Sequence, residues 1–152
     1  LIPAPAEPAA VQQTRSNNLS ELVRKQKLRK VDKWQKKDWV TVADEVQYKI
    51  SELNTLNMLK TEGNTLNHCV ATLWSSCVFD YTRIYSLQRR MQNQSRYHKR
   101  LTIEVNHSKS IYQIKGNANR DAEYHEMKLI KQWAKEVGFC LSDAKLNRNM
   151  PF

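Results

Sequence analysis

The sequence predicts an α+β fold: a small antiparallel sheet of about four to five strands, packed against helices and preceded by a basic helix. Short runs rich in β-branched and aromatic residues, separated by turn residues, occupy 39–50 and 84–114 and predict strands. Segments whose apolar residues are spaced three and four apart lie between and after these runs, and predict helices that cover the sheet. At 152 residues the chain has the length of one domain.

The first 37 residues differ in composition from the rest. Residues 1–18 are rich in Pro, Ala, Gln and Ser and lack apolar periodicity, which predicts a linker or disorder, such as a linker leading in from a longer parent protein. Residues 19–37 carry eight lysines and arginines around a narrow apolar stripe and predict the basic helix. That helix is either peripheral, with solvated lysines, or a polyanion-binding face. Residues 38–152 are predicted to form the α+β domain.

A hairpin and a short helix are predicted first in this domain. Trp39–Val42 and Val46–Ile50 have the composition of strands, and the acidic pair at 44–45 is predicted to be the turn between them. A helix is predicted over Leu56–Thr61. It is expected to end near Gly63, because glycine adopts positive φ angles at little cost and the chain has few glycines.

A second helix is predicted from Leu66 to about Cys77, since the apolar residues in this stretch share one helical face. The final helix is predicted over Asp121–Val137, with Gly138 ending it. Between the two helices the sequence predicts three successive strands, of which the last two form an antiparallel hairpin. These strands are Ile84–Leu87, Leu101–Val105 and Ser110–Ile114.

The charge favours an anionic partner. The net charge is +10 and the pI about 9.7, a balance that favours nucleic acid or another polyanion; a generally basic surface without such a role is the alternative. Residues 83–100 contain six basic residues and no acidic one and are predicted to include an exposed loop that follows a phosphate backbone, or else a solvated loop of no special role. The six are Arg83, Arg89, Arg90, Arg96, Lys99 and Arg100.

Several classes of protein are disfavoured. Three cysteines without CxxC spacing predict neither a disulfide framework nor a structural zinc site. Reduced thiols in a cytoplasmic protein are the simplest interpretation. No stretch has the length and apolar character of a membrane helix or the pattern of a signal peptide. The sequence therefore predicts no metal site, no cofactor and no membrane partner.

His68 and Cys69 are the first candidate catalytic residues. A cysteine near a helix N-terminus favours the thiolate. Neighbours on a helix point about 100° apart, however, so these two side chains would not face each other. Cys69 is therefore predicted to face the core as a small apolar residue. His68 is expected at the rim of the site, as an acid/base group, a phosphate contact or a structural histidine.

Polar positions on the predicted hairpin complete the candidate site. Thr102 and Glu104 lie on the strand face opposite its apolar residues. On the next strand, Gln113 shares a face with Ile111, so its amide is expected on that side of the sheet. The polar turn 115–120 follows, and its amides and basic side chains are expected to form an anion-binding concavity. The candidate residues in this turn are Lys115, Asn117 and Asn119.

Four segments in order resemble the PcfJ-like family. Residues 59–70 resemble its "EG…L.HCV" signature through Glu62-Gly63, His68-Cys69-Val70 and the leucines beside them. The resemblance continues through 84–87, 101–105 and 113–119, and closes with the helix that carries Trp133. It covers about residues 39–137.

The resemblance implies a domain found at the end of longer proteins from plasmids, phages and related mobile elements. It implies polar positions at Glu62, His68, Cys69, Thr102, Glu104, Gln113, Gly116 and Asn119. The family commonly has a tyrosine shortly after the "HCV", whereas this chain has Ala71-Thr72-Leu73. If that tyrosine took part in chemistry, Tyr81 or Tyr85 would have to replace it, or the activity is lost.

Three functions remain open on these grounds. The first is nucleic-acid association, with DNA or RNA, through the basic helix and the arginine-rich loop. The second is an enzyme acting on a nucleotide, nucleic acid or protein, which requires His68, Glu104 and Gln113 to converge on one pocket. The third is a protein–protein interaction domain in which the same residues hold sheet and helix together.

Overall fold

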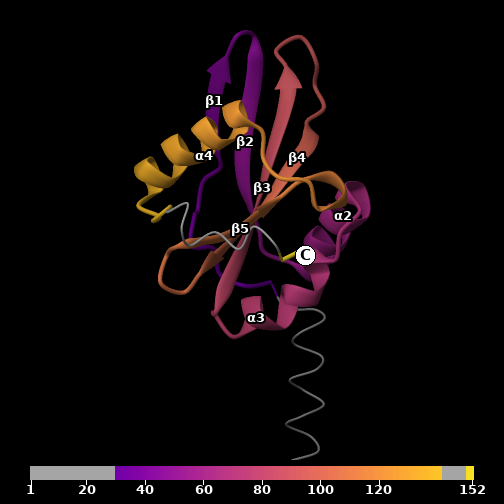
Figure 1. The fold of residues 1–152 in the computed structure, drawn as a ribbon, viewed down its shortest axis with the longest axis vertical. Coiled ribbons are helices and arrows are strands. Elements are labelled where there is room, and N and C mark those ends of the chain that lie inside the picture. Colours follow the sequence, from indigo (N-terminus) through magenta and orange to yellow (C-terminus); the bar gives the residue numbers. More distant parts are fainter. Residues whose placement is uncertain (1–29, 142–149) are drawn as a thin grey trace, which may run out of the picture.

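A computed structural model describes residues 30–141 and 150–152. In these ranges the chain forms one five-stranded antiparallel sheet in the order β1-β2-β3-β4-β5, with helices on both sides (Figure 1). The predicted α+β class is confirmed. The strands are β1 (Trp39–Ala43), β2 (Val46–Leu53), β3 (Thr82–Met91), β4 (His98–Asn106) and β5 (Ile111–Lys115).

The first hairpin turns where the sequence predicts. Asp44 and Glu45 have φ angles of 50° and 65°, as in the two-residue turns that match the twist of paired strands. Strands β3 and β4 are longer than the apolar segments from which they were predicted. β3 continues past Leu87 to Met91, so the loop between β3 and β4 is short and most of the basic stretch lies within the two strands.

One face of the sheet is covered by α4 (Tyr124–Val137). Tyr85 and Leu87 of β3 and Ile103 of β4 are fully buried here against Trp133. The helix begins at Tyr124, three residues later than predicted, because Glu123 and Glu126 form a capping box at its start. It ends at Gly138, as predicted, with a φ angle of 85°.

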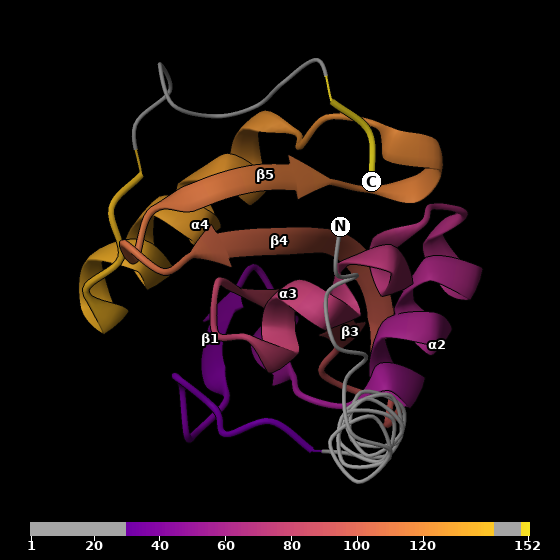
Figure 2. The same ribbon diagram turned by 90° about the horizontal axis from the view of Figure 1, so that it is seen from below.

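The opposite face carries α2 (Leu56–Leu66), the 3₁₀ turn η1 (Val70–Leu73) and α3 (Trp74–Val78), and Figure 2 shows them on the other side from α4. The predicted helix end at Gly63 is wrong, because α2 runs through it and ends at Asn67, whose φ angle is 53°. A Cβ on Gly63 would lie 2.6 Å from the carbonyl oxygen of His68. Glycine is therefore needed here for a close approach of the chain, not for a turn.

The predicted helix from Leu66 to Cys77 is also wrong. The chain instead leaves α2 through a loop and continues into η1 and the short α3. Its apolar residues are still buried, in a second cluster between these elements and the sheet: Val31, Leu53, Leu59, Val70, Trp74, Cys77 and Ile84. Burial raises the pKa of the Cys77 thiol to about 12, as expected for a thiol in apolar surroundings.

The predicted basic helix falls partly on residues 19–29, which lie outside the described residues. Its remaining part, 30–37, is not helical. Val31 is buried there, donating its main-chain N–H to the carbonyl of Asn54 at 3.0 Å and accepting from the Asn54 side chain at 3.1 Å. These contacts hold the segment against the end of β2, and they outweigh its helical periodicity. Among the described residues, no helix is long and apolar enough to cross a membrane.

Candidate functional site

A chain of buried polar groups lies between α2 and the sheet. The Thr102 hydroxyl of β4 donates to Glu62 Oε2 at 2.7 Å, and His68 Nε2 lies 2.8 Å from the same hydroxyl. Ser86 of β3 donates to Glu62 Oε1 at 2.9 Å, and Lys99 Nζ lies 2.8 Å from that oxygen. We call these five residues the Glu62 network. Glu62 itself is fully buried in α2, so a carboxylate joins the helix to two strands.

The hydrogen bonds assign the protonation state of His68. The main-chain N–H of Val70 donates to Nδ1 at 3.4 Å, so Nδ1 is an acceptor and Nε2 carries the proton. Nε2 then donates to Thr102, which donates in turn to Glu62. Burial lowers the pKa of His68, which favours this neutral imidazole.

Glu104 and Gln113 face each other across β4 and β5, but neither forms a hydrogen bond with His68 in the described part of the chain. Glu104 accepts from the Thr82 hydroxyl at 3.1 Å, and burial raises its pKa. Gln113 donates to the main-chain oxygen of Met150. The expected convergence of the three side chains is therefore not found. Thr102, not Glu104, contacts His68, since residues two apart on a strand are separated by about 7 Å.

Cys69 is exposed, so the prediction that it faces the core is wrong. The error follows from the helix boundary: Cys69 precedes η1 and has no helical neighbours before it. The tyrosines proposed to replace the family's tyrosine also lie away from His68. Tyr85 is buried on the α4 face, and Tyr81 is 63% exposed.

The turn after β5 is held by its own contacts. Lys115 Nζ lies 2.8 Å from Asp121 Oδ1, so its charge is paired. The Asn67 side chain donates to Asn117 Oδ1 at 2.9 Å, which joins the turn to the end of α2. Asn119 Oδ1 accepts from the main-chain N–H of Phe152 at 2.9 Å. The predicted concavity is thus largely filled by neighbouring protein groups.

Sequence reasoning missed three residues of this region: Asn67, Ser86 and Phe152. Asn67 has the positive φ angle for which asparagine is enriched, and Ser86 is a polar residue within an apolar strand. Both are signals that the sequence contains. Phe152 has no such signal, because its ring packs on His68, with centroids 5.0 Å apart, only through the tertiary fold.

Two basic residues proposed for the exposed loop are structural. Arg83 is only 2% exposed, bonded to the main-chain oxygens of Asp32 and Cys77 and paired with Asp80. Arg100 lies 3.2 Å from the buried Glu126 of α4. The prediction of an exposed loop position is wrong for both, because strands β3 and β4 extend to include them.

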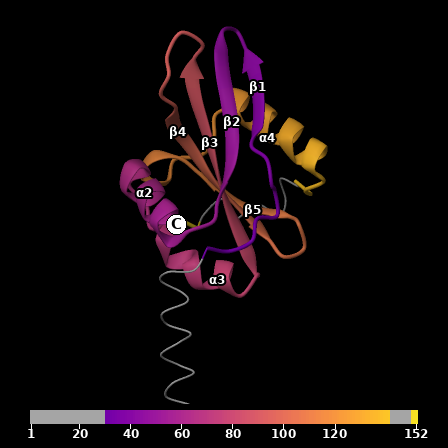
Figure 3. The same ribbon diagram turned by 180° about the vertical axis from the view of Figure 1, so that it is seen from behind.

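Other basic residues share an uncovered part of the sheet. The ends of β1–β4 near Met91 extend beyond α2 (Figure 3). On the α2 side of these ends, Lys49 Nζ lies 4.1 Å from the centroid of the Tyr97 ring, and the Arg90 guanidinium lies 5.1 Å from it. We define the open sheet face as these three residues with their neighbours on the same side of the strands: Val40, Val42, Gln47, Lys49, Gln88, Arg90, Tyr97 and Lys99.

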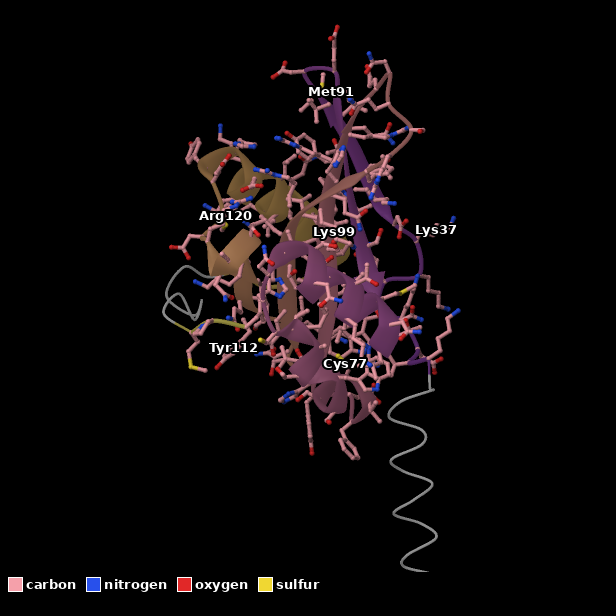
Figure 4. All side chains as sticks on the ribbon, turned by 90° about the vertical axis from the view of Figure 1, so that its right-hand side faces the viewer. Lys37, Cys77, Met91, Lys99, Tyr112 and Arg120 are labelled. Carbon is pink, nitrogen blue, oxygen red and sulfur yellow. The ribbon has the colours of Figure 1, made fainter. Side chains whose placement is uncertain are left out.

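A hollow of about 430 Å³ connects the open sheet face to the Glu62 network. Its charged lining residues are the cations Lys33, Lys49 and Lys99 and the acidic Asp38 and Glu52. Lys99 belongs to both regions and lies beside α2, below the hairpin end marked by Met91 (Figure 4). The Ser51 hydroxyl is buried and has no hydrogen-bond partner among the described residues.

Within the described ranges, no group of three His, Cys, Asp or Glu side chains is placed to hold a metal ion. Comparisons with curated proteins and with solved structures found no match. A family model described as PcfJ-like protein matches residues 3–129. That match spans most of the chain and includes the Glu62 network, the turn after β5 and the open sheet face, and the chain therefore belongs to the PcfJ-like protein family.

Proposed function

We propose that this domain binds single-stranded nucleic acid, DNA or RNA, on the open sheet face, as part of a mobile-element protein. The observation that carries the proposal is the grouping of Tyr97 with Lys49 and Arg90 on an uncovered sheet surface. Flat sheets that bear aromatic and basic side chains suit splayed bases, which stack on rings and guanidinium planes while cations neutralise the phosphates.

The charges around this face support the proposal. Among the described residues, no carboxylate forms an ion pair with Lys49 or Arg90; Arg90 instead bonds Gln47 Oε1 at 3.0 Å and the main-chain oxygen of Gln94 at 2.8 Å. Lys33 lines the adjoining hollow, and Arg96, next to Tyr97 in the chain, is exposed. The net charge of +10 adds a long-range attraction.

The enzyme alternative has less support in this conformation. Both ring nitrogens of His68 are occupied, Nε2 by Thr102 and Nδ1 by the main chain of Val70. The Phe152 ring packs against the imidazole. An acid/base role would require one of these contacts to open first.

The test is fluorescence anisotropy of a labelled single-stranded oligonucleotide, titrated at several salt concentrations. Tyr97→Ala should weaken binding by roughly tenfold, because one stacked base is lost. Lys49→Ala combined with Arg90→Ala should reduce the slope of log K against log salt by about 1.4, or about 0.7 for each lost phosphate contact.

The matched control is Lys131→Ala combined with Lys135→Ala, which removes the same charge from exposed positions on α4. The control should leave the salt slope nearly unchanged. If the salt slope decreased equally in the two double variants, binding would reflect only the overall charge. Binding without any salt dependence would contradict the proposal altogether.

A further inference from the structure

The segment Met150–Phe152 is held by side chains from three separate elements. Gln113 of β5 donates to the main-chain oxygen of Met150. Asn119, in the turn after β5, accepts from the main-chain N–H of Phe152 at 2.9 Å. The Phe152 ring packs at 49° to the His68 ring. Two amide side chains thus bind main-chain atoms two residues apart, while the histidine contacts the aromatic side chain.

The receiving surface is built without this segment. The bond of 2.9 Å between the Asn67 and Asn117 side chains fixes the two loops against each other. The main-chain N–H of Gly116 donates to the oxygen of Arg120 at 2.8 Å, which closes the turn. The orientation of Asn119 follows from this turn, where its φ angle is 60°. The binding groups are therefore preorganised by the rest of the domain.

Gln113 gives a second sign of a binding position. Its residue is only 4% exposed. In the part of the chain that the structure describes, the hydrogen-bond partner of its side-chain NH₂ group is Met150. The Met150 oxygen therefore satisfies a side-chain donor of Gln113 while the segment is in place.

The bound segment itself is only lightly buried. Met150 is 53% exposed, Pro151 is exposed and Phe152 is partly buried. The contacts that would break if it left include the two amide hydrogen bonds, the ring contact with His68 and the packing of Phe152 against the apolar cluster that contains Val70. We propose that His68, Gln113 and Asn119 form an exchangeable binding site for an extended peptide with an aromatic side chain, which Met150–Phe152 fills in cis.

A peptide fits these contacts better than a nucleobase does. An amide pair beside an imidazole also suits a stacked base. Here, however, the two amides contact one main-chain oxygen and one main-chain N–H two residues further along the chain. The geometry thus matches main-chain recognition with an aromatic pocket, as in other extended-peptide sites.

The test follows the His68 ring by NMR in the full chain. Burial lowers the pKa of His68, so Phe152→Ala should raise it towards the usual value by exposing the ring. Excess acetyl-Met-Pro-Phe-amide should lower it again by refilling the site. The ring of His125, exposed on α4, is the internal control and should not respond to the peptide.

Two further comparisons make the test specific. Acetyl-Met-Pro-Ala-amide should bind at least about tenfold more weakly, since it lacks the ring. Adding Asn119→Ala to Phe152→Ala should abolish the response to the aromatic peptide while the fold is retained.

Four outcomes would overturn the proposal. The first is an unchanged pKa of His68 in Phe152→Ala. The second is unfolding of the domain by Phe152→Ala, which would make the segment an integral part of the core. The third is an equal effect of the two peptides. The fourth is restoration of the lowered pKa by an oligonucleotide and not by the aromatic peptide, which would assign the site to a base.

Discussion

The two faces of the sheet are packed by different chemistry. On the α4 face, apolar side chains from β2–β5 meet Ile130 and Trp133, and the rings of Tyr85, Trp133 and Phe139 contact one another edge to face. On the α2 face, apolar residues fill only part of the interface, and the Glu62 network fills the rest. The same strands supply both faces, since alternate residues point to opposite sides.

The difference shows where the domain depends on geometry as well as on burial. Apolar packing is non-directional and tolerates small shifts. A buried carboxylate is stable only if each partner keeps its hydrogen bond. The buried carboxylate of Glu126, at the edge of the α4 face, likewise depends on its partners, Arg100 and Arg120. The α2 face is therefore expected to be the more sensitive to the placement of single groups.

The largest expected effect is on the apolar face. Trp133→Ala should lower the free energy of unfolding by about 3–5 kcal/mol, because it leaves a large cavity among buried rings. Urea denaturation measures it. Lys131→Ala, two positions away and exposed, should change stability by less than about 0.5 kcal/mol. A loss for Trp133→Ala as small as that of the control would mean that α4 contributes little to the fold.

The Glu62 network should give the next largest effect. Glu62→Ala removes the acceptor of two buried hydroxyls and the partner of Lys99, and should cost about 2–4 kcal/mol. Glu62→Gln, which keeps one acceptor oxygen, should cost less. Urea denaturation of both variants measures the difference.

A double-mutant cycle sharpens this prediction. Glu62→Ala and Thr102→Val should show a coupling of about 0.5–3 kcal/mol, because both belong to one hydrogen-bonded chain. If the losses in the free energy of unfolding were additive, the two residues would act independently. The α2 face would then not differ from the α4 face in the way its geometry indicates.

A smaller effect is expected where the chain approaches itself at Gly63. Gly63→Ala should cost about 1–3 kcal/mol, because the added Cβ would clash with the His68 carbonyl and force the loop to move. Asn64→Ala is the control: it is exposed in the same helix, where alanine is favourable. Chemical denaturation compares the two, and a stabilising Gly63→Ala would contradict the close approach.

The strands could be predicted because their residues carry a local signal. Trp39–Val42 is rich in β-branched and aromatic residues, Leu101–Val105 alternates apolar and polar residues, and the turn at Asp44 is where local chemistry places it. The region after α2 could not be predicted, since Leu66, Val70 and Trp74 have helical spacing but are buried from three different elements: the end of α2, the 3₁₀ turn η1 and the short α3. Spacing alone does not distinguish these conformations.

The sequence predicted which residues belong to the candidate site better than it predicted which of them contact each other. Glu62, His68 and Thr102 were all named from the sequence, and the structure joins them in one hydrogen-bonded chain. Their pairing was not predicted. Glu104 was expected beside His68, whereas it contacts Thr82. Which of two polar residues on one strand face meets a helix depends on the register between helix and sheet, which no local pattern encodes.

The sequence by itself determines the fold class, the basic character and the first and last hairpins, because these follow from composition, alternation and turn chemistry along neighbouring residues. The tertiary structure decides which cations are buried or paired with carboxylates. It buries Arg83, pairs Arg100 with Glu126 and leaves Lys49 and Arg90 beside Tyr97. The physical reason is that exposure and charge pairing depend on residues far apart in the chain, and these meet only when the sheet is assembled.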